Sequence, residues 1–185
     1  MQVMKKTDRG LSKRCYMVEK EIVEKEKHNK MKFIVDLTMG KLVKWLRIAG
    51  YDTVFYNSSN LDKLIEIASR ESRTILTRNS GFIKKERKVL EERGIPHLLL
   101  ASDSVEEQLK ETVDYFKLDL KESSFTLCVD CNKPFFKISK EDALGKVPEF
   151  VYQNYNEFVQ CTNCKKIFWE GTHRERMEEM LKRVY

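Results

Sequence analysis

From residue 31 onward, short apolar runs alternate with segments in which apolar residues recur every three or four positions. Short runs rich in β-branched residues are typical of buried parallel strands, and the longer spacing is typical of amphipathic helices. The first run, Phe33-Ile-Val35, ends at the charge of Asp36, and the helical spacing that follows it can end at Gly50. The last helix of this region opens with a capping box, Ser104-Val-Glu-Glu107. The strands are predicted at 33–35, 53–56, 73–77 and 97–100, and the helices after them at 42–49, 61–68, 82–93 and 104–116.

The alternation of strands and helices predicts an α/β fold over residues 31–121, with a mostly parallel sheet covered by helices on both faces. After Lys121 the pattern changes, because cysteine pairs, dense aromatic residues and short strand-like pieces replace the long helices. Residues 122–170 are therefore predicted to form a separate small module. A second capping box, Thr172-His-Arg-Glu175, predicts a C-terminal helix within 171–185.

The first 30 residues lack this pattern and are rich in charge. They hold nine Lys and Arg against five Asp and Glu, whereas the remainder holds 26 against 24 and so has a net charge of only +2. We predict a charged leader over 1–30, either disordered or in an exposed helix, and Met31 is an alternative initiator. Because the overall charge is weak support for nucleic-acid binding, any basic surface must come from local clusters.

Composition also limits where the protein acts. No apolar run approaches the roughly 18 residues needed to cross a bilayer, and no signal-peptide core is visible. The sequence therefore predicts a protein that does not span a membrane and that lies in the cytoplasm.

The second module carries two C-x-x-C pairs, Cys128-Val-Asp-Cys131 and Cys161-Thr-Asn-Cys164. Two residues between thiolates let one tight turn place both sulfurs about 2.3 Å from Zn²⁺, and two such turns complete a tetrahedron. Disulfides and ordinary buried thiols are the alternatives, and a reducing compartment disfavours disulfides. The pairs predict a structural zinc ribbon, with no open position for catalysis at its metal. Cys15 in the leader is predicted to be a free thiol.

Polar residues stand where the predicted strands end. Asp36 ends the first strand and Asp103 follows the fourth, while Asp62 opens the second helix. Arg78 and Asn79 follow the third strand. Because the carboxyl ends of parallel strands meet at one edge of a sheet, these side chains are expected to share one cleft. Clustered carboxylates hold Mg²⁺ or Mn²⁺, which activate water and stabilise a leaving oxygen, so this pattern indicates a nuclease.

Most of these residues also have a structural interpretation. Asp62 can simply favour the positive end of a helix, and Asp103 can form part of the turn before its helix. Asn79 can cap the turn that follows it. Asp36 differs from the others, since nothing local explains a charge at the end of a buried strand.

Basic residues at a spacing of three lie on the first predicted helix, at Lys41, Lys44 and Arg47, and Arg78 is expected near them. These side chains either face a phosphate backbone, which gives salt-sensitive affinity, or form the solvated flank of an amphipathic helix. The aromatic residues of the second module either stack on bases or form its core. They are Phe135, Phe136, Tyr152, Tyr155, Phe158 and Trp169.

Several motifs occur in a recognisable order, namely Asp36 with Gly40-Lys-Leu-Val-Lys-Trp-Leu-Arg-Ile-Ala-Gly-Tyr-Asp52, Asp62-Lys-Leu-Ile-Glu-Ile-Ala68, Ile75-Leu-Thr-Arg78, Val147-Pro148, Glu157-Phe158, both cysteine pairs and Phe168-Trp-Glu-Gly-Thr-His173. In this order the chain resembles the Mut-seven C-terminal RNase domain family over about residues 31–177. The resemblance implies a PIN-like three-layer α/β/α nuclease domain followed by a zinc ribbon. It also implies metal-dependent cleavage of RNA.

By position, the resemblance implies that Asp36 is the metal-binding acid of the first strand and that Asp62 is the acid that opens the later helix. The family usually has Thr-Arg-Asp after the third strand, where this chain has Thr77-Arg78-Asn79. Asparagine offers a carbonyl oxygen without the charge, which weakens a Mg²⁺ site that relies on few carboxylates. Asp103 is an auxiliary candidate.

Three hypotheses remain. The first is an endoribonuclease with a catalytic Mg²⁺ or Mn²⁺ beside a structural zinc. The second is a catalytically weakened RNA-binding or adaptor protein, which Asn79 favours. The third is an interaction protein whose ribbon docks on a larger assembly.

Overall fold

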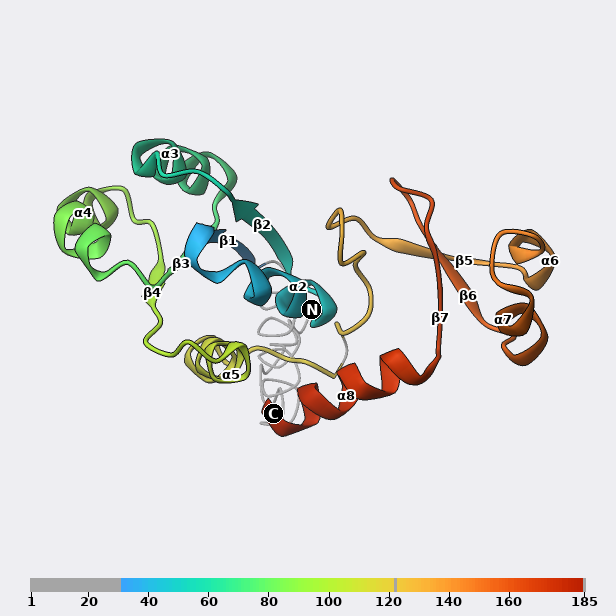
Figure 1. The fold of residues 1–185 in the computed structure, drawn as a ribbon. Coiled ribbons are helices and arrows are strands. Elements are labelled where there is room, and N and C mark those ends of the chain that lie inside the picture. The colour runs from blue at the N-terminus through green and yellow to red at the C-terminus, as the bar shows by residue number, and fades with distance from the viewer. Residues whose placement is uncertain (1–30, 122, 185) are drawn as a thin grey trace, which may run out of the picture.

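The structure is a computed structural model that describes residues 31–121 and 123–184. Its larger part is built on a four-stranded parallel sheet with the order β2-β1-β3-β4 (Figure 1). The charged leader predicted over 1–30, with Cys15, lies outside the described residues. The strands are β1 (Lys32–Asp36), β2 (Asp52–Tyr56), β3 (Thr74–Thr77) and β4 (His97–Leu99).

The strand order reverses at β1, because the chain places β2 on one side of it and then β3 on the other. In the register, Asp36 lies opposite Tyr56 of β2, and Val35 lies opposite Leu76 of β3. Asp36 and Thr77 therefore end neighbouring strands at the same edge. Open α/β sheets bind ligands at their carboxyl edge where the order of the strands reverses, so Asp36 lies where this fold is expected to bind one.

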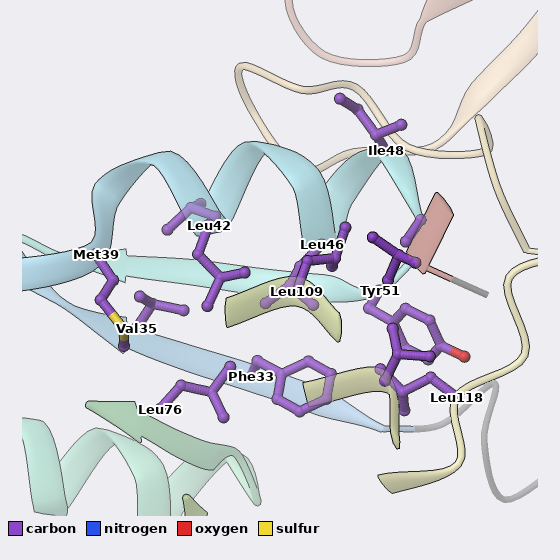
Figure 2. Packing of buried hydrophobic residues seen from close by; sticks show 14 of the residues in the cluster. Phe33, Val35, Met39, Leu42, Leu46, Ile48, Tyr51, Leu76, Leu109 and Leu118 are labelled. Atoms are coloured by element: carbon purple, nitrogen blue, oxygen red, sulfur yellow. The ribbon is translucent and has the colours of Figure 1, made fainter. Parts of the chain in front are cut away.

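Helices cover both faces of the sheet, as the alternation of side chains along β1 requires. They are η1 (Leu37–Met39), α2 (Gly40–Ile48), α3 (Leu61–Glu71), α4 (Ser80–Glu92) and α5 (Val105–Phe116). Phe33 and Val35 point into a core shared with α2 and α5, which Figure 2 shows from close by. Ile34 points into the opposite core, with α3 and α4. Each side chain of this size that is fully buried contributes about 1.5–3 kcal/mol. The predicted three-layer α/β/α arrangement is confirmed.

The smaller part contains a three-stranded antiparallel sheet in the order β5-β6-β7. Its elements are β5 (Phe135–Ile138), α6 (Lys140–Ala143), α7 (Glu149–Asn154), β6 (Phe158–Cys161) and β7 (Ile167–Trp169). Ala143 and Val151 of the two short helices pack with Phe158 in a small core. Neither helix was predicted, because both are too short to show a helical spacing of apolar residues.

The predicted C-terminal helix is present as α8 (Thr172–Val184), which packs on the α/β domain. Leu181 and Val184 join the core of α2 and α5, and the Arg183 guanidinium pairs with the Glu106 carboxylate of α5 at 3.0 Å. Within the described residues, no helix is both long and apolar enough to cross a membrane.

The start of α5 differs from the predicted capping box. The side chain of Ser104 makes no capping hydrogen bond. Instead, the Ser102 hydroxyl accepts from the Ser104 amide at 3.0 Å and donates to the Glu107 carboxylate. Ser104 is the N-cap residue, as predicted, but the capping box itself was wrong, because the Ser102 hydroxyl binds the Ser104 amide in place of the Glu107 carboxylate.

Candidate functional site

Asp36 is a buried carboxylate, 3% exposed, at the end of β1. Its Oδ1 accepts hydrogen bonds from the backbone amide and the hydroxyl of Thr38, at 2.9 and 2.5 Å. Its Oδ2 accepts from the hydroxyl of Thr77. No ion pair among the described residues includes Asp36. Burying a carboxylate is costly without a counter-charge, and a divalent cation would supply one here.

Asn79 is connected to Asp36 by hydrogen bonds through the hydroxyl of Thr77. Its backbone amide donates to the Thr77 hydroxyl oxygen at 2.9 Å, and that hydroxyl donates in turn to Asp36. The side-chain oxygen of Asn79 accepts from the backbone amide of Phe82 at 2.9 Å and caps the N-terminus of α4. Asn79 is therefore near the acid, but its carbonyl oxygen already has a partner.

The other two aspartates lie in more exposed surroundings. Asp62 is in the first turn of α3 and is exposed. It lies close enough to α4 to influence Lys85, whose pKa is raised mainly by its hydrogen bond with Glu86 and less by the charge of Asp62. Asp103 forms an ion pair with Arg78, and its side chain is 88% exposed. Thus Asp103 contacts a cation of the next strand end rather than Asp36.

The aspartates do not form a preassembled cluster. Within the described part of the chain, the four cysteines are the one group of three or more acidic, histidine or cysteine side chains arranged to share an ion. The edge of the sheet therefore offers one well-ordered carboxylate, Asp36, with Asn79 beside it. Asp62 remains a candidate on the neighbouring helix.

The basic residues predicted to contact RNA have different surroundings. Lys41 and Lys44 are exposed and line a hollow of about 440 Å³ at the start of α2, with no acidic residue in its lining. Arg78 donates to Asp103, and its Nε is buried without a hydrogen-bond partner among the described residues. Neither lysine forms an ion pair among the described residues, although the charge of Lys44 helps to lower the pKa of the Asp130 carboxyl, which is set mainly by its hydrogen bond from Lys166.

Arg47 points elsewhere. Its Nε donates to the backbone oxygen of Thr53 at 2.9 Å, and its Nη1 donates to the backbone oxygens of Val129 and Asp130 at 2.7 and 2.9 Å. The last two carbonyls lie between Cys128 and Cys131. The Arg47 side chain therefore ties α2 to the first cysteine turn and has little freedom to contact a phosphate.

The four cysteines converge as a zinc site requires. They are free thiols whose sulfurs all lie within 4.8 Å of one another. Cys128 is 3.7 Å from Cys164, and Cys131 is 3.2 Å from Cys161, close to the spacing of about 3.8 Å in a tetrahedron with Zn–S of about 2.3 Å. Burial raises the pKa of the Cys128 thiol, so zinc binding would have to release its proton. The donor set fits Zn²⁺ with no open position.

The first cysteine turn also contacts the start of the edge strand β2. The side-chain oxygen of Asn132 accepts from the Thr53 amide at 3.1 Å, and its Nδ2 donates to the Asp52 carboxylate. Asp52 pairs with the buried Arg73 at 2.8 Å. The ribbon and the α/β domain are therefore joined by polar contacts at the start of β2.

The ribbon aromatics are mostly structural. Phe158 is in the small core, and Tyr155 and Trp169 pack against it. Phe135 packs on the ring of Phe168 with centroids 4.9 Å apart. Phe136 is the exception among these, because it is 42% exposed.

Sequence reasoning missed three residues that shape these sites. Thr38 and Thr77 orient Asp36, and Asn132 joins the ribbon to β2. The two threonines could have been predicted, because each lies next to the end of a predicted strand, where its hydroxyl can reach a carboxylate. Asn132 carried none, because its partners lie about 80 residues earlier in the chain.

The fold and its sites together define a class of protein: a parallel α/β domain with a buried acid at the carboxyl edge of its sheet, joined to a ribbon whose four cysteines could hold a metal ion. A family model described as Mut7-C RNAse domain matches residues 31–181, and the chain belongs to this family. The match confirms the resemblance seen in the sequence and supports a ribonuclease-type activity. No curated protein and no solved structure matches the chain.

Proposed function

We propose that the protein is a metal-dependent ribonuclease that hydrolyses phosphodiester bonds of RNA, with a zinc ribbon as a structural part. The observation that carries the proposal is Asp36, a carboxylate buried where the strand order reverses and, among the residues that the structure describes, without a cationic side chain within ion-pair distance. Membership of an RNase domain family supports RNA as the substrate class. The free cysteines fit the reducing cytoplasm, which we propose as the location.

The residues at the edge fit a hard divalent cation, because they offer oxygen atoms. A bound Mg²⁺ or Mn²⁺ would supply Lewis acidity toward the phosphate and lower the pKa of the attacking water. Asp36 would hold the ion, with Thr38 and Thr77 fixing the direction of its two oxygens. Asp62 is the second proposed acid. Asp103 is less suited, since it already pairs with Arg78.

In this proposal, Lys41 and Lys44 bind the RNA backbone. Both residues line the hollow at the start of α2, the helix that follows β1 and η1 in the chain. Arg78 can add a further contact if a phosphate replaces Asp103 as its partner. Arg47 is omitted, because its donors are used by three backbone carbonyls.

A catalytically weakened RNA-binding or adaptor protein is the second candidate. The observation that favours it is Asn79, which brings no charge to the site and whose oxygen is engaged as the cap of α4. With Asn79 engaged, the ion would rely on fewer anionic ligands, and hard cations bind more weakly to such sites.

The test is Mn²⁺-dependent cleavage of single-stranded RNA by wild type and by Asp36→Asn, purified side by side. The proposal expects cleavage by wild type that falls by about a hundredfold or more in the variant, because one uncharged oxygen replaces the main ligand. Asp114→Asn, an exposed acid on α5, is the matched control and should cleave as wild type does. Equal cleavage by wild type and Asp36→Asn would assign the activity to a contaminant.

A further inference from the structure

A groove on the ribbon has the chemistry of an anion site. It has a volume of about 570 Å³ and lies between residues 146–148, which join α6 to α7, and the β6–β7 hairpin. Three lysines line it, and none of its lining residues is acidic. The groove shares no residue with the edge that carries Asp36 or with the hollow beside Lys41. The lysines are Lys146, Lys165 and Lys166.

Two of the three positive charges are not compensated. Lys166 pairs with the Asp130 carboxylate at 2.5 Å. Lys165 donates to the backbone oxygen of Thr162 at 2.8 Å, which leaves its charge unpaired. No hydrogen bond or ion pair of the described residues uses the ammonium group of Lys146. Such a cluster attracts a polyanion.

An exposed aromatic ring lies on the same face of the sheet. Phe136 of β5 is directly opposite Gln160 of β6, and Gln160 is directly opposite Ile167 of β7. Directly opposed residues share a face with Cβ atoms about 4.5–5.5 Å apart. Gln160 and Ile167 both line the groove, so the exposed ring of Phe136 flanks it. Positive grooves beside exposed aromatic rings are typical of single-strand nucleic-acid binding.

We propose that this lysine groove binds the phosphate backbone of single-stranded RNA, with a base stacked on Phe136. The inference rests on the proposed function, because it takes RNA as the substrate. It adds a second contact on the ribbon to the one at the edge of the sheet. RNA long enough to reach both sites should therefore bind more tightly than RNA that fills only one.

The lysines have a second candidate role, which is to offset the charge of the metal centre, and the experiment separates the two roles. Lys165 directly follows Cys164 in the sequence, and a zinc ion with four thiolates has a net negative charge that lysines can offset. Lysines that serve the metal centre would change zinc affinity when removed. Lysines that bind RNA would change the salt dependence of RNA binding instead.

The experiment uses the zinc-loaded full chain without Mg²⁺ or Mn²⁺ and fluorescein-labelled oligo(U) in a short and a long form. Binding is measured by anisotropy over a range of salt concentrations. For Lys146→Gln/Lys165→Gln, the slope of log K against log salt should become shallower by about 1.4 with the long RNA, at about 0.7 per phosphate contact. Phe136→Leu should weaken binding by about fivefold or more, and Phe136→Trp should retain it. Lys88→Gln on α4, far from the ribbon in Figure 1, is the control.

The outcomes separate this inference from the proposed function. If wild type shows no cleavage in the separate Mn²⁺ assay, the proposed function fails. If wild type cleaves RNA in that assay but binds neither oligo(U) here, or if the double lysine variant keeps the wild-type slope, this inference is overturned while the proposed function stands. A fall in zinc affinity in place of a change in slope, measured by chelator competition, would also overturn it. The Phe136 variants give an independent reading, because they leave every lysine in place.

Discussion

The network around Asp36 shows how single residues fix the candidate site. Each oxygen of its carboxylate has a hydroxyl donor, from Thr38 on one side and Thr77 on the other. The Thr77 hydroxyl also accepts from the Asn79 amide, so it has a partner in both directions. This holds the carboxylate in one orientation before any ligand arrives, and preorganised groups need no rearrangement when charge develops.

Asn79→Asp is the residue-scale test between the two candidate functions. Aspartate caps helices as well as asparagine does, so the free energy of unfolding should change by less than about 0.5 kcal/mol. Because Asn79 serves as a cap, we expect Mn²⁺-dependent cleavage to stay within about threefold of wild type. Cleavage and oligo(U) binding are measured together, with urea unfolding as the stability control.

A large rise in cleavage at unchanged RNA binding would contradict this expectation. It would mean that the native site lacks a ligand at this position and that the protein is nearer to the RNA-binding alternative. Asn79→Ala is a useful companion, because loss of the cap should cost about 1 kcal/mol without adding a charge.

At the scale of elements, the edge strand β2 depends on an ion pair for its stability. Arg73 is 7% exposed and pairs with both Asp52 and Glu71, at 2.8 and 2.7 Å. Burial raises the pKa of the Asp52 carboxyl, but the hydrogen bonds from Arg73 and Asn132 outweigh it and hold the pKa below its ordinary value. The folded state therefore favours the ionised form of Asp52.

This pKa shift predicts a loss of stability in acid. A folded-state pKa below the unfolded value, about 3.9 for aspartate, gives a stabilisation that is complete above about pH 4 and is lost as the pH falls through the folded-state pKa. Asp52→Asn should cost about 2 kcal/mol at pH 7, and urea unfolding should show this cost shrinking steadily as the pH falls below about 4. Asp114→Asn should change stability little at either pH. A pH-independent cost for Asp52→Asn would contradict this account.

The elements that the sequence predicted are those with strong periodicity. The apolar run of β1 and the spacing of α2 and α3 were sufficient, because buried faces leave a repeat in the sequence. The short helices α6 and α7 left no such repeat. The start of α5 at Ser104 was predicted correctly, but its capping box was not, because the Ser102 hydroxyl binds the Ser104 amide in place of the Glu107 carboxylate.

For the whole molecule, the main feature is that the ribbon and the α/β domain share polar contacts. Arg47 of α2 donates to two carbonyls of the first cysteine turn, and Asn132 of that turn binds the edge of β2. The sequence could predict the four cysteines from their spacing. It could not predict this interface, because Arg47 looks like one more basic residue at a spacing of three and its partners are more than 80 residues away.

Zinc binding should therefore depend on a residue of the other domain. Arg47→Met removes the donors that hold the cysteine turn in place. Zinc affinity should therefore fall by about tenfold, as is typical when a residue that supports the metal ligands by hydrogen bonds is removed. Chelator competition measures the change. Lys41→Met, which alters an exposed lysine on α2, is the control and should leave the affinity unchanged. Equal affinities in the two variants would show that the domains are not coupled.

The central claim is that Asp36 binds a divalent cation at the edge of the sheet. Crystals of the zinc-loaded protein soaked in Mn²⁺, with data collected at the manganese absorption edge, test it directly. The account predicts an anomalous peak about 2.1 Å from a carboxylate oxygen of Asp36, separate from the metal of the four cysteines. A crystal with no manganese peak beside Asp36, although its edge is open to solvent, would contradict it.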